Sequence, residues 1–172
     1  MICFGISILC FSHLSNADEL QDIIQESSIL LNVCSDPKVG YKIKCNPDWI
    51  ITDEPKSVSI LILDDPELLV TATISKSDQG GISLSSLTPD KLRMMGQYGP
   101  QISTENVKIG GKDAIRVKAT AVGLDQMQLL DYYVVKDGYL YSIFFAVNPA
   151  ERFKDFQELF DVMIQSYEFI DS

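Results

Sequence analysis

The chain has 172 residues and a formal net charge of −10, from 14 basic and 24 acidic side chains. This length suits one domain with a sizeable core and is short for two. The acidic balance argues against nucleic acid or an anionic membrane surface as the partner, because the field of the protein repels phosphate groups.

The first seventeen residues differ from the rest of the chain. Residues 1–17 contain no Lys, Arg, Asp or Glu, and the segment from Ile2 to Leu14 is almost wholly apolar. Ser15 and Ala17 place small residues where a signal peptidase reads the chain. The pattern predicts a secretory signal peptide cleaved after Ala17, although the basic n-region of such signals is missing. A membrane anchor is the alternative, but the apolar run is shorter than the roughly 20 residues of a spanning helix. We therefore expect a periplasmic or secreted protein with no membrane span after cleavage.

Cleavage at that position would remove two of the four cysteines, Cys3 and Cys10. An oxidising compartment would allow the remaining pair, Cys34 and Cys45, to form a disulfide. Such a loop would constrain the unfolded chain by roughly 3 kcal/mol. The alternative is two small buried thiols, and the sequence leaves the choice open.

Residues 18–39 are expected to form an N-terminal helix and a lead-in to the main domain. The helix is predicted from Asp18 to about Leu31, and acidic side chains crowd its first turn, where the helix dipole favours negative charge. Ile29–Val33 could equally be a short strand, and Asp36-Pro37 predicts a turn. One side of the predicted helix has Leu20, Ile23, Ile24, Ser27 and Leu31.

Three strands are predicted in the first half of the main domain, and after a turn at residues 46–48 the extended chain is expected to restart at Trp49-Ile50-Ile51. In the first of them, apolar side chains alternate with Lys42 and Lys44, as in a half-buried strand. Residues 64–67, Asp-Asp-Pro-Glu, connect the other two as a tight acidic hairpin. The predicted strands are Tyr41–Cys45, Val58–Leu63 and Leu68–Ile74.

A polar stretch and a second helix follow. Ser75–Ser86 contains two glycines and a run of serines, which predicts a mobile surface loop of the kind that often carries function. Thr88 is a suitable N-cap and Pro89 a suitable first residue for a helix that ends at Gly99-Pro100. One face of this helix is predicted to have Leu92, Met95 and Tyr98.

The second half of the chain reads as a β-meander that ends in a helix. Turns are predicted at Gly110-Gly111, around Gly123 and at Asp137-Gly138. The last strand is apolar on both faces apart from Ser142, so it is expected in the middle of a sheet. The predicted strands are Ile102–Ile109, Ala114–Val122, Met127–Val135 and Tyr139–Val147.

The closing helix is predicted to begin directly after that strand and to run to about Tyr167. Asn148 offers an N-cap oxygen and Pro149 suits the first helical position. Its apolar residues recur at three- and four-residue steps, so the helix is expected to lie on the sheet. They are Phe153, Phe156, Leu159, Phe160, Met163, Ile164 and Tyr167.

The elements together predict an α+β fold with roughly seven or eight mostly antiparallel strands and three helices. The expected architecture is an α/β/α sandwich, in which a central mostly antiparallel sheet is covered by helices on both faces. No linker divides the chain, so residues 40–172 are expected to be one domain.

Residues that carry recognisable chemistry are few. His13, the only histidine, lies in the predicted signal peptide, so the mature chain would lack the histidine of nucleophilic triads and of common zinc sites. Gly80-Gly81 and Gly110-Gly111 lack the spacing and the lysine of a phosphate-binding loop. We therefore predict no catalytic residue, no metal ligands and no cofactor, and the binding residues stay unknown.

Two further features have a functional and a structural interpretation. Asp64, Asp65 and Glu67 supply the oxygens that calcium prefers, but they lack the spacing of a dedicated calcium loop, so a solvated turn is favoured. Trp49, the single tryptophan, is more readily explained by packing at a sheet end than as a stacking platform.

The order of turns and strands resembles the PsbP-like domain. The marks are a strand at Gly40-Tyr41, a turn at Pro47-Asp48-Trp49, the sequence Val107-Lys108-Ile109-Gly110-Gly111, the Asp137-Gly138 hairpin and a last helix ending near Ser166–Phe169. The likeness covers about Gly40 to Phe169. This family includes the extrinsic PsbP subunit of photosystem II, bacterial exported proteins and a Ran-binding nuclear transport factor. The resemblance implies an α/β/α sandwich that works by binding a partner, without catalysis of its own. The metal binding of some photosynthetic members has no matching position here.

We therefore expect an exported, non-enzymatic binding module of the cell envelope, with an unidentified protein or small ligand as partner. One alternative is a carboxylate-based hydrolase with a site near residues 75–87, which requires two close acids, one of them with a raised pKa. The other is a weak calcium-responsive module. The sequence does not predict the oligomeric state.

Overall fold

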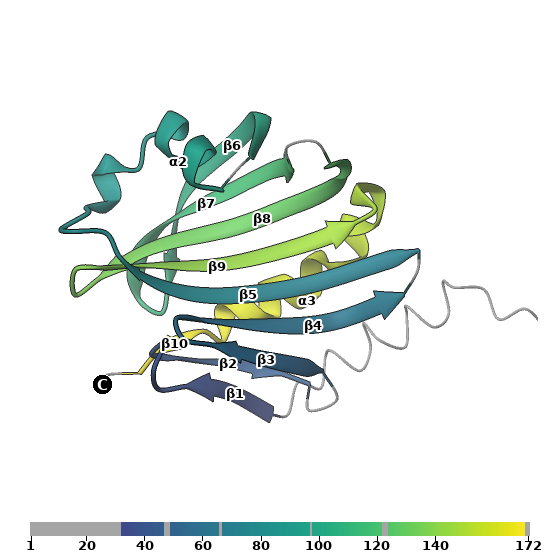
Figure 1. Cartoon of the computed structure of the whole chain (residues 1–172), viewed down its shortest axis with the longest axis horizontal. Helices are drawn as coiled ribbons and strands as arrows, with labels where there is room; N and C mark the ends of the chain where they lie inside the picture. The colour runs from purple at the N-terminus through teal and green to yellow at the C-terminus, as the bar shows by residue number, and fades with distance from the viewer. Residues whose placement is uncertain (1–31, 47–48, 66, 97, 122–123, 171–172) are drawn as a thin grey trace, which may run out of the picture.

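A computed structural model describes residues 32–46, 49–65, 67–96, 98–121 and 124–170 of the chain (Figure 1). Within these ranges the chain forms ten strands, two α-helices and two short 3₁₀-helices. The predicted signal peptide over residues 1–17 and the helix expected from Asp18 to about Leu31 lie outside them. The division at residue 39 stays a prediction.

Seven strands form one antiparallel sheet in the order β3-β4-β5-β9-β8-β7-β6. The prediction that the most apolar strand lies in the middle is confirmed, because β9 pairs with β5 on one side and β8 on the other. The strands are β3 (Ile50–Glu54), β4 (Ser57–Asp65), β5 (Leu68–Asp78), β6 (Tyr98–Ile109), β7 (Lys112–Ala121), β8 (Leu124–Lys136) and β9 (Tyr139–Asn148).

Two of the predicted hairpin turns have the backbone that their residues favour. Asp137 and Gly138 have φ angles of 53° and 82°, and Gly110 and Gly111 have φ angles of 53° and 76°. Two successive residues with positive φ form the type I′ turn, whose twist matches that of the flanking strands. The meander β6-β7-β8-β9 is therefore confirmed.

A second, three-stranded sheet has the order β1-β2-β10, with β1 (Asn32–Asp36), β2 (Tyr41–Cys45) and β10 (Glu168–Phe169). The predicted alternation in β2 is confirmed: Tyr41 and Ile43 are buried, and Lys44 is exposed. Both buried residues belong to the main hydrophobic core. The small sheet therefore helps to close one face of the large sheet.

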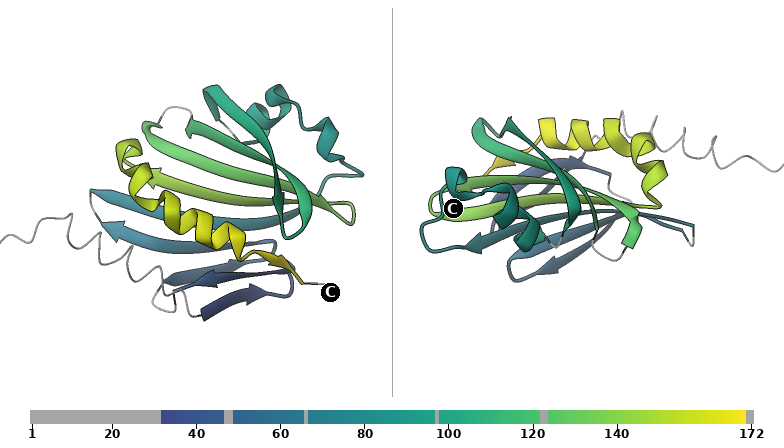
Figure 2. Two further views of the ribbon diagram at one scale, coloured as in Figure 1. Left: turned by 180° about the vertical axis from the view of Figure 1, so that it is seen from behind. Right: turned by 90° about the horizontal axis from the view of Figure 1, so that it is seen from above.

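The helix α3 (Phe153–Gln165) lies across that same face, as Figure 2 shows. The ring of Phe160 in α3 stacks on the ring of Phe145 in β9, with the ring centroids 4.5 Å apart. The predicted apolar stripe is confirmed by its buried residues, Phe153, Phe156, Leu159, Phe160 and Met163.

The start of this helix was predicted too early. Asn148 is the last residue of β9 and pairs with Leu69 of β5, so the ladder holds it in the extended conformation and it cannot cap a helix. Pro149 precedes the 3₁₀-helix η2 (Ala150–Arg152), and α3 begins only at Phe153.

The opposite face has less helical cover. The helix α2 (Pro89–Gly96) and the 3₁₀-helix η1 (Leu84–Ser86) contact β6, β7 and β8. Leu92 of α2 belongs to a second core cluster that includes Val117, Leu129 and Tyr133. The α+β class with a mostly antiparallel sheet is confirmed, whereas a sandwich with helices covering both faces is not.

Near α2, one predicted boundary is confirmed and two others differ from the prediction. The predicted N-cap is correct, since the backbone N–H of Lys91 donates to Thr88 Oγ1. Tyr98 begins β6 instead of ending the helix, and its ring lies so close to Gly96 that a Cβ there would approach it to 2.1 Å. The strand β5 also continues through Ser75 to Asp78, where a loop was predicted, because these residues still pair with β9.

Candidate functional site

A groove of about 630 Å³ lies between η1 and the β6–β7 hairpin. A smaller pocket of about 180 Å³ continues it toward α2 and shares Leu87, Asn106 and Ile115 with it. The residues that line the two together are Leu84, Ser85, Leu87, Leu92, Thr104, Glu105, Asn106, Val107, Asp113, Ala114 and Ile115.

The groove has apolar walls and a polar rim. Leu87 and Leu92 are 4% and 0% exposed and form part of the second core cluster, against which Ile115 packs. The lining contains two acids, Glu105 and Asp113, and no basic side chain. Apolar walls with a few polar groups are typical of binding sites.

Each of the two acids has an ion pair with a residue beside the groove. Arg116 contacts Glu105, and Lys108 Nζ lies 2.7 Å from Asp113 Oδ1. The hydrogen bond from Lys108 lowers the pKa of Asp113 below its ordinary value. The two ion pairs lie on β6 and β7, at the rim of the groove.

A polar cluster on the same face of the sheet centres on Asp131 of β8. Asp131 is 3% exposed and is the only buried charged side chain in the part of the chain that the structure describes. The Tyr98 hydroxyl donates to its Oδ2 at 2.7 Å, and the Ser142 hydroxyl donates to its Oδ1 at 2.8 Å. The hydroxyl oxygens of Tyr98 and Tyr133 lie 2.7 Å apart.

Burial raises the pKa of Asp131 to about 6, against the lowering effect of the hydrogen bonds from Tyr98, Ser142 and Tyr133. Burial also raises the pKa of Tyr98 and of Tyr133, and the neighbouring Asp131 carboxylate raises both further. Near neutral pH the cluster therefore contains one carboxylate and neutral hydroxyls. Because Tyr98 begins β6 two residues after the end of α2, the cluster fixes the α2 side of the groove to β8.

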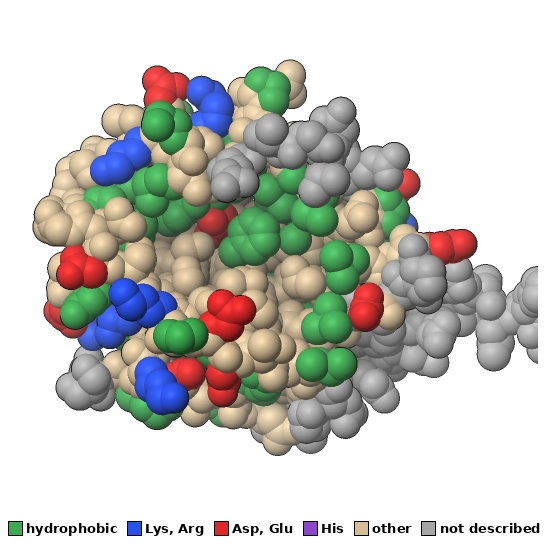
Figure 3. Space-filling view, viewed as in Figure 1, with side chains coloured by type: hydrophobic (Ala, Val, Ile, Leu, Met, Phe, Trp, Pro, Cys, Tyr) green, Lys and Arg blue, Asp and Glu red, His purple; other side chains and the backbone are tan. Residues whose placement is uncertain are grey.

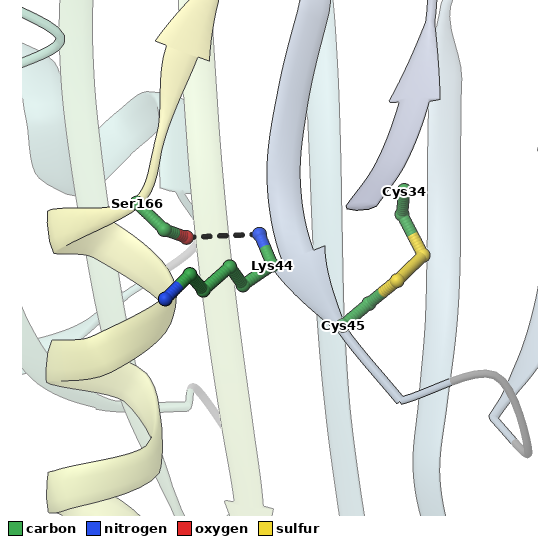
Figure 4. Close-up of a disulfide and its surroundings, with 4 residues drawn as sticks. All are labelled: Cys34, Lys44, Cys45 and Ser166. Carbon is green, nitrogen blue, oxygen red and sulfur yellow. Dashed lines mark hydrogen bonds between the residues drawn. A yellow bond between two sulfur atoms is a disulfide. The ribbon is translucent and has the colours of Figure 1, made fainter. Parts of the chain in front are cut away.

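The two cysteines that remain after the predicted cleavage are joined in the structure. Cys34 of β1 and Cys45 of β2 form a disulfide with an S–S distance of 1.98 Å and a Cα–Cα distance of 5.7 Å (Figure 4). Beside it, the backbone N–H of Lys44 donates to the hydroxyl of Ser166, just after α3, at 2.9 Å. The disulfide therefore links two strands of the small sheet. Neither cysteine lines the groove.

The other residues singled out from the sequence lie apart from one another. Asp64 is exposed at the β4–β5 hairpin, and Trp49 packs against the α3-face core, which favours its structural interpretation. Of the stretch 75–87, only Leu84, Ser85 and Leu87 line the groove. Across the described ranges, no group of three or more His, Cys, Asp and Glu side chains is arranged to hold a metal ion.

Sequence reasoning missed both parts of this site. Asp131 had a usable signal, because a single acid between Leu130 and Tyr132 in a strand apolar on both faces is buried wherever that strand is covered. The groove had no comparable signal. Its walls come from η1, α2 and the β6–β7 hairpin, which meet only in the folded chain.

Comparison with known proteins gives matches in structure alone. No protein-family model matches the chain, and no curated protein matches it by sequence. Cyanobacterial PsbP (CyanoP) from Synechocystis has a TM-score of 0.56 at 16% identity, over 80% of this chain and 91% of that one. LpqN of Mycobacterium tuberculosis, described as involved in cell envelope biogenesis, has a TM-score of 0.51 at 15% identity, over 81% and 90%. The Saccharomyces cerevisiae Ran-binding protein Mog1p has a TM-score of 0.52 at 10% identity, over 77% and 91%.

The three matches confirm that the chain has the PsbP-like fold. At these identities the likeness defines the fold, and function has to be argued from the site. Among the described helices, none is both long and apolar enough to cross a membrane.

Proposed function

We propose that this protein is a non-enzymatic binding module that is exported by residues 1–17 and holds a protein partner in the cell envelope. The observation that carries this proposal is the groove between η1, α2 and the β6–β7 hairpin. Its larger part has a volume of about 630 Å³ and apolar walls formed by Leu84, Leu87 and Ile115. Volumes of about 300–1,000 Å³ are usual for binding sites.

Two further observations support the class and the compartment. The Cys34–Cys45 disulfide suits an oxidising compartment such as the periplasm or the cell exterior. Among proteins of the same fold, LpqN is described as involved in cell envelope biogenesis and Mog1p as a Ran-binding protein. These are properties of those proteins, and they support the proposal of binding in the envelope.

The chemistry of the buried cluster supports a role without catalysis. A carboxylate-based hydrolase needs a second acid close to the first. The raised pKa of Asp131 has burial as its cause, and the groups that modify it are tyrosine and serine hydroxyls and a backbone hydrogen bond. Asp131 lies on β8, whereas the hydrolase hypothesis placed its site near residues 75–87.

The test is site-specific photo-cross-linking in an envelope extract of the source cells. A photoreactive amino acid replaces Ser85, which lines the groove, and in a control replaces Lys154, which is exposed on α3. A protein that is cross-linked from position 85 and not from position 154 is the expected result. Equal cross-linking from both positions, or turnover of a substrate by the purified protein, would contradict the proposal.

The export step has its own measurement. Mass spectrometry of the protein recovered from the producing cells should give an N-terminus at Asp18. A protein recovered from the cytoplasm with Met1 in place would overturn the predicted location and leave the groove proposal standing.

A further inference from the structure

We propose that the groove receives its partner as an extended, basic and apolar segment that adds a strand to the free edge of β6. This rests on the proposed binding function and names the class of partner. An extended segment pairs with such an edge through main-chain hydrogen bonds, which give affinity, while side-chain pockets give specificity.

The first observation concerns the backbone of β6. Side chains of a strand alternate between its two faces, so a groove on one face alone would contact every second residue. Thr104, Glu105, Asn106 and Val107 all line the groove, although they are consecutive. The groove therefore opens onto the edge of the strand.

That edge has no strand beside it within the described ranges. Residues 104–107 pair on their inner side with residues 117–114 of β7, and β6 is the last strand of the sheet. The outward N–H and C=O groups of an edge strand are available to another extended chain. At about 3.3 Å a residue, the exposed stretch suits about four residues of a partner.

The second observation concerns the wall that faces this edge. Leu84 and Leu87 come from the η1 region, Leu92 comes from α2 and Ile115 comes from β7. Leu87 and Leu92 are buried, so the half-buried Leu84 and Ile115 provide the apolar surface that a partner would contact. An added strand would direct alternate side chains toward that surface. The partner segment should therefore have apolar residues at every second position.

Charge selects among the chains that could occupy the groove. The two charged lining residues, Glu105 and Asp113, are both acidic, and each is ion-paired with a basic residue beside the groove. The net charge of −10 of the whole chain is therefore what favours a basic occupant. Residues 18–31 of this chain contain four acids and no Lys or Arg, so they match the sign of the groove. A second copy of the chain has the same excess of negative charge. A basic segment of another protein is the complementary occupant.

The test uses a phage-displayed library of random linear peptides, selected on the purified, disulfide-bonded protein. Selected peptides should alternate apolar residues with Lys or Arg. A synthetic selected peptide is then N-methylated at one or the other alternate set of amides. Methylation of the set that faces β6 should weaken binding about tenfold or more, while methylation of the other set should change it little. Binding should also slow amide hydrogen exchange within Thr104–Val107.

Two variants of the protein provide a matched pair. Ser85→Trp fills the groove and should weaken binding of the same peptide about tenfold. Ser86→Trp places the same side chain on the next exposed residue of η1, which does not line the groove, and should leave binding unchanged. Circular dichroism and the melting temperature show whether both variants fold as the parent does.

Several results would overturn the proposal. These are a library that yields no binder, binding that is indifferent to N-methylation, and protection that appears at the other edge strand, β3. A dimer that Ser85→Trp dissociates would identify a second copy as the occupant, and binding that appears only after deletion of residues 18–31 would identify the chain's own segment. A partner cross-linked from position 85 would keep the proposed function in each of these cases, so the two failures are distinguishable.

Discussion

The face of the seven-stranded sheet beneath α3 and the face beneath α2 differ in both cover and chemistry. The α3 face is closed by a helix and by the small sheet, and its core is entirely apolar and aromatic. Its stacked rings come from distant parts of the chain. Phe145 of β9 stacks on Phe160 of α3, and Tyr41 of β2 stacks on Tyr167, which lies after α3. Such a core is expected to supply most of the stability of the fold.

The α2 face is closed only over β6, β7 and β8 and contains the buried carboxylate of Asp131. Toward β5 and β4 this face has serine and threonine side chains, as in the hydrogen bond between Ser59 Oγ and Thr73 Oγ1, which are 3.3 Å apart. Figure 3 looks onto this face and shows, near its centre, uncharged polar side chains and backbone between hydrophobic and acidic side chains. The groove opens at the side of this less completely covered face. The α3 face therefore holds most of the buried apolar core, and the α2 face has the buried carboxylate and the groove.

The largest expected effect tests the α3 face. Phe160→Ala removes a ring that is 0% exposed and contacts Phe145, Phe153 and Phe156. The loss of buried area and the cavity that remains should lower the free energy of unfolding by about 3–5 kcal/mol. Urea denaturation followed by circular dichroism measures it.

Leu92→Ala, on the α2 face, is the matched comparison for that variant. Leu92 is also 0% exposed, but it belongs to a helix of eight residues that contacts mainly β6. Its loss should therefore lie near the lower end of the range of about 2–5 kcal/mol seen for leucine truncation. A larger loss from Leu92→Ala than from Phe160→Ala would reverse the proposed division between the faces.

The second prediction uses the pH dependence of the α2 face. The pKa of Asp131 is about 6 in the folded protein, against an ordinary value of 3.8. The folded state therefore holds this proton to higher pH than the unfolded state does. The stability that Asp131 contributes is fully present below about pH 4 and is lost as the pH rises to about 6. Asp131→Asn cannot titrate, so the parent should lose about 3 kcal/mol relative to the variant across this window.

Urea denaturation of both proteins across the same pH range measures this difference. The difference between their free energies of unfolding at each pH cancels the contributions of the acids that both proteins contain, such as those of the exposed ion pairs. A parallel pH dependence of the two proteins would mean that Asp131 titrates in the folded state as it does in the unfolded chain.

The third prediction concerns the small sheet that helps to close the α3 face. The disulfide joins residues that are 11 apart in sequence. Replacing both Cys34 and Cys45 by Ala should cost about 2–3 kcal/mol, because the unfolded chain regains the entropy of an open loop. Thermal unfolding with and without reductant measures the effect in the parent. The double variant is the control, and a melting temperature of the parent that is unchanged by reductant would contradict the prediction.

Much of the α3 face could be predicted from the sequence, because its signals are local. The two-sided apolar run of β9 indicated a central strand, and the stripe from Phe153 to Met163 indicated a helix that covers a sheet. The glycine turns gave the hairpins of the meander. Each of these signals occupies a short stretch of chain, and the structure confirms them.

The α2 face could not be predicted in the same way. Tyr98 fits the apolar periodicity of α2, yet its hydroxyl bonds to Asp131, 33 residues later in the chain, and this contact belongs to β6. The serines of β5 look like a loop, but their backbone is paired with β9. In both places a long-range pairing outweighs the local preference, and no local pattern reports it. The groove arises from the same kind of distant contact.

The smallest expected effect isolates the hydrogen bond that fixes α2 to the sheet. Tyr98→Phe keeps the ring that fills the space beside Gly96 but removes the hydroxyl that donates to Asp131. The loss of this hydrogen bond should cost about 1–2 kcal/mol at neutral pH. The same hydroxyl stabilises the carboxylate, so its removal should raise the pKa of Asp131 further. The cost should then be smaller below about pH 4, where Asp131 is neutral in both states, than above about pH 6.

Tyr132→Phe is the control for this variant, because Tyr132 lies next to Asp131 on β8 and points into the core of the α3 face. Its burial is similar, at 3% against 2% for Tyr98, and its hydroxyl neighbour is Arg116. The cost of losing that hydroxyl should stay nearly constant between about pH 5 and about pH 8, where the cost of Tyr98→Phe rises. Arginine stays cationic in this window, and the ordinary pKa values of aspartate and glutamate, the residue types of Asp161 and Glu105 that also act on Tyr132, lie below it. If the costs of Tyr98→Phe and Tyr132→Phe followed the same pH curve, Asp131 would not set the chemistry of its face. The difference between the two faces would then be one of helical cover alone.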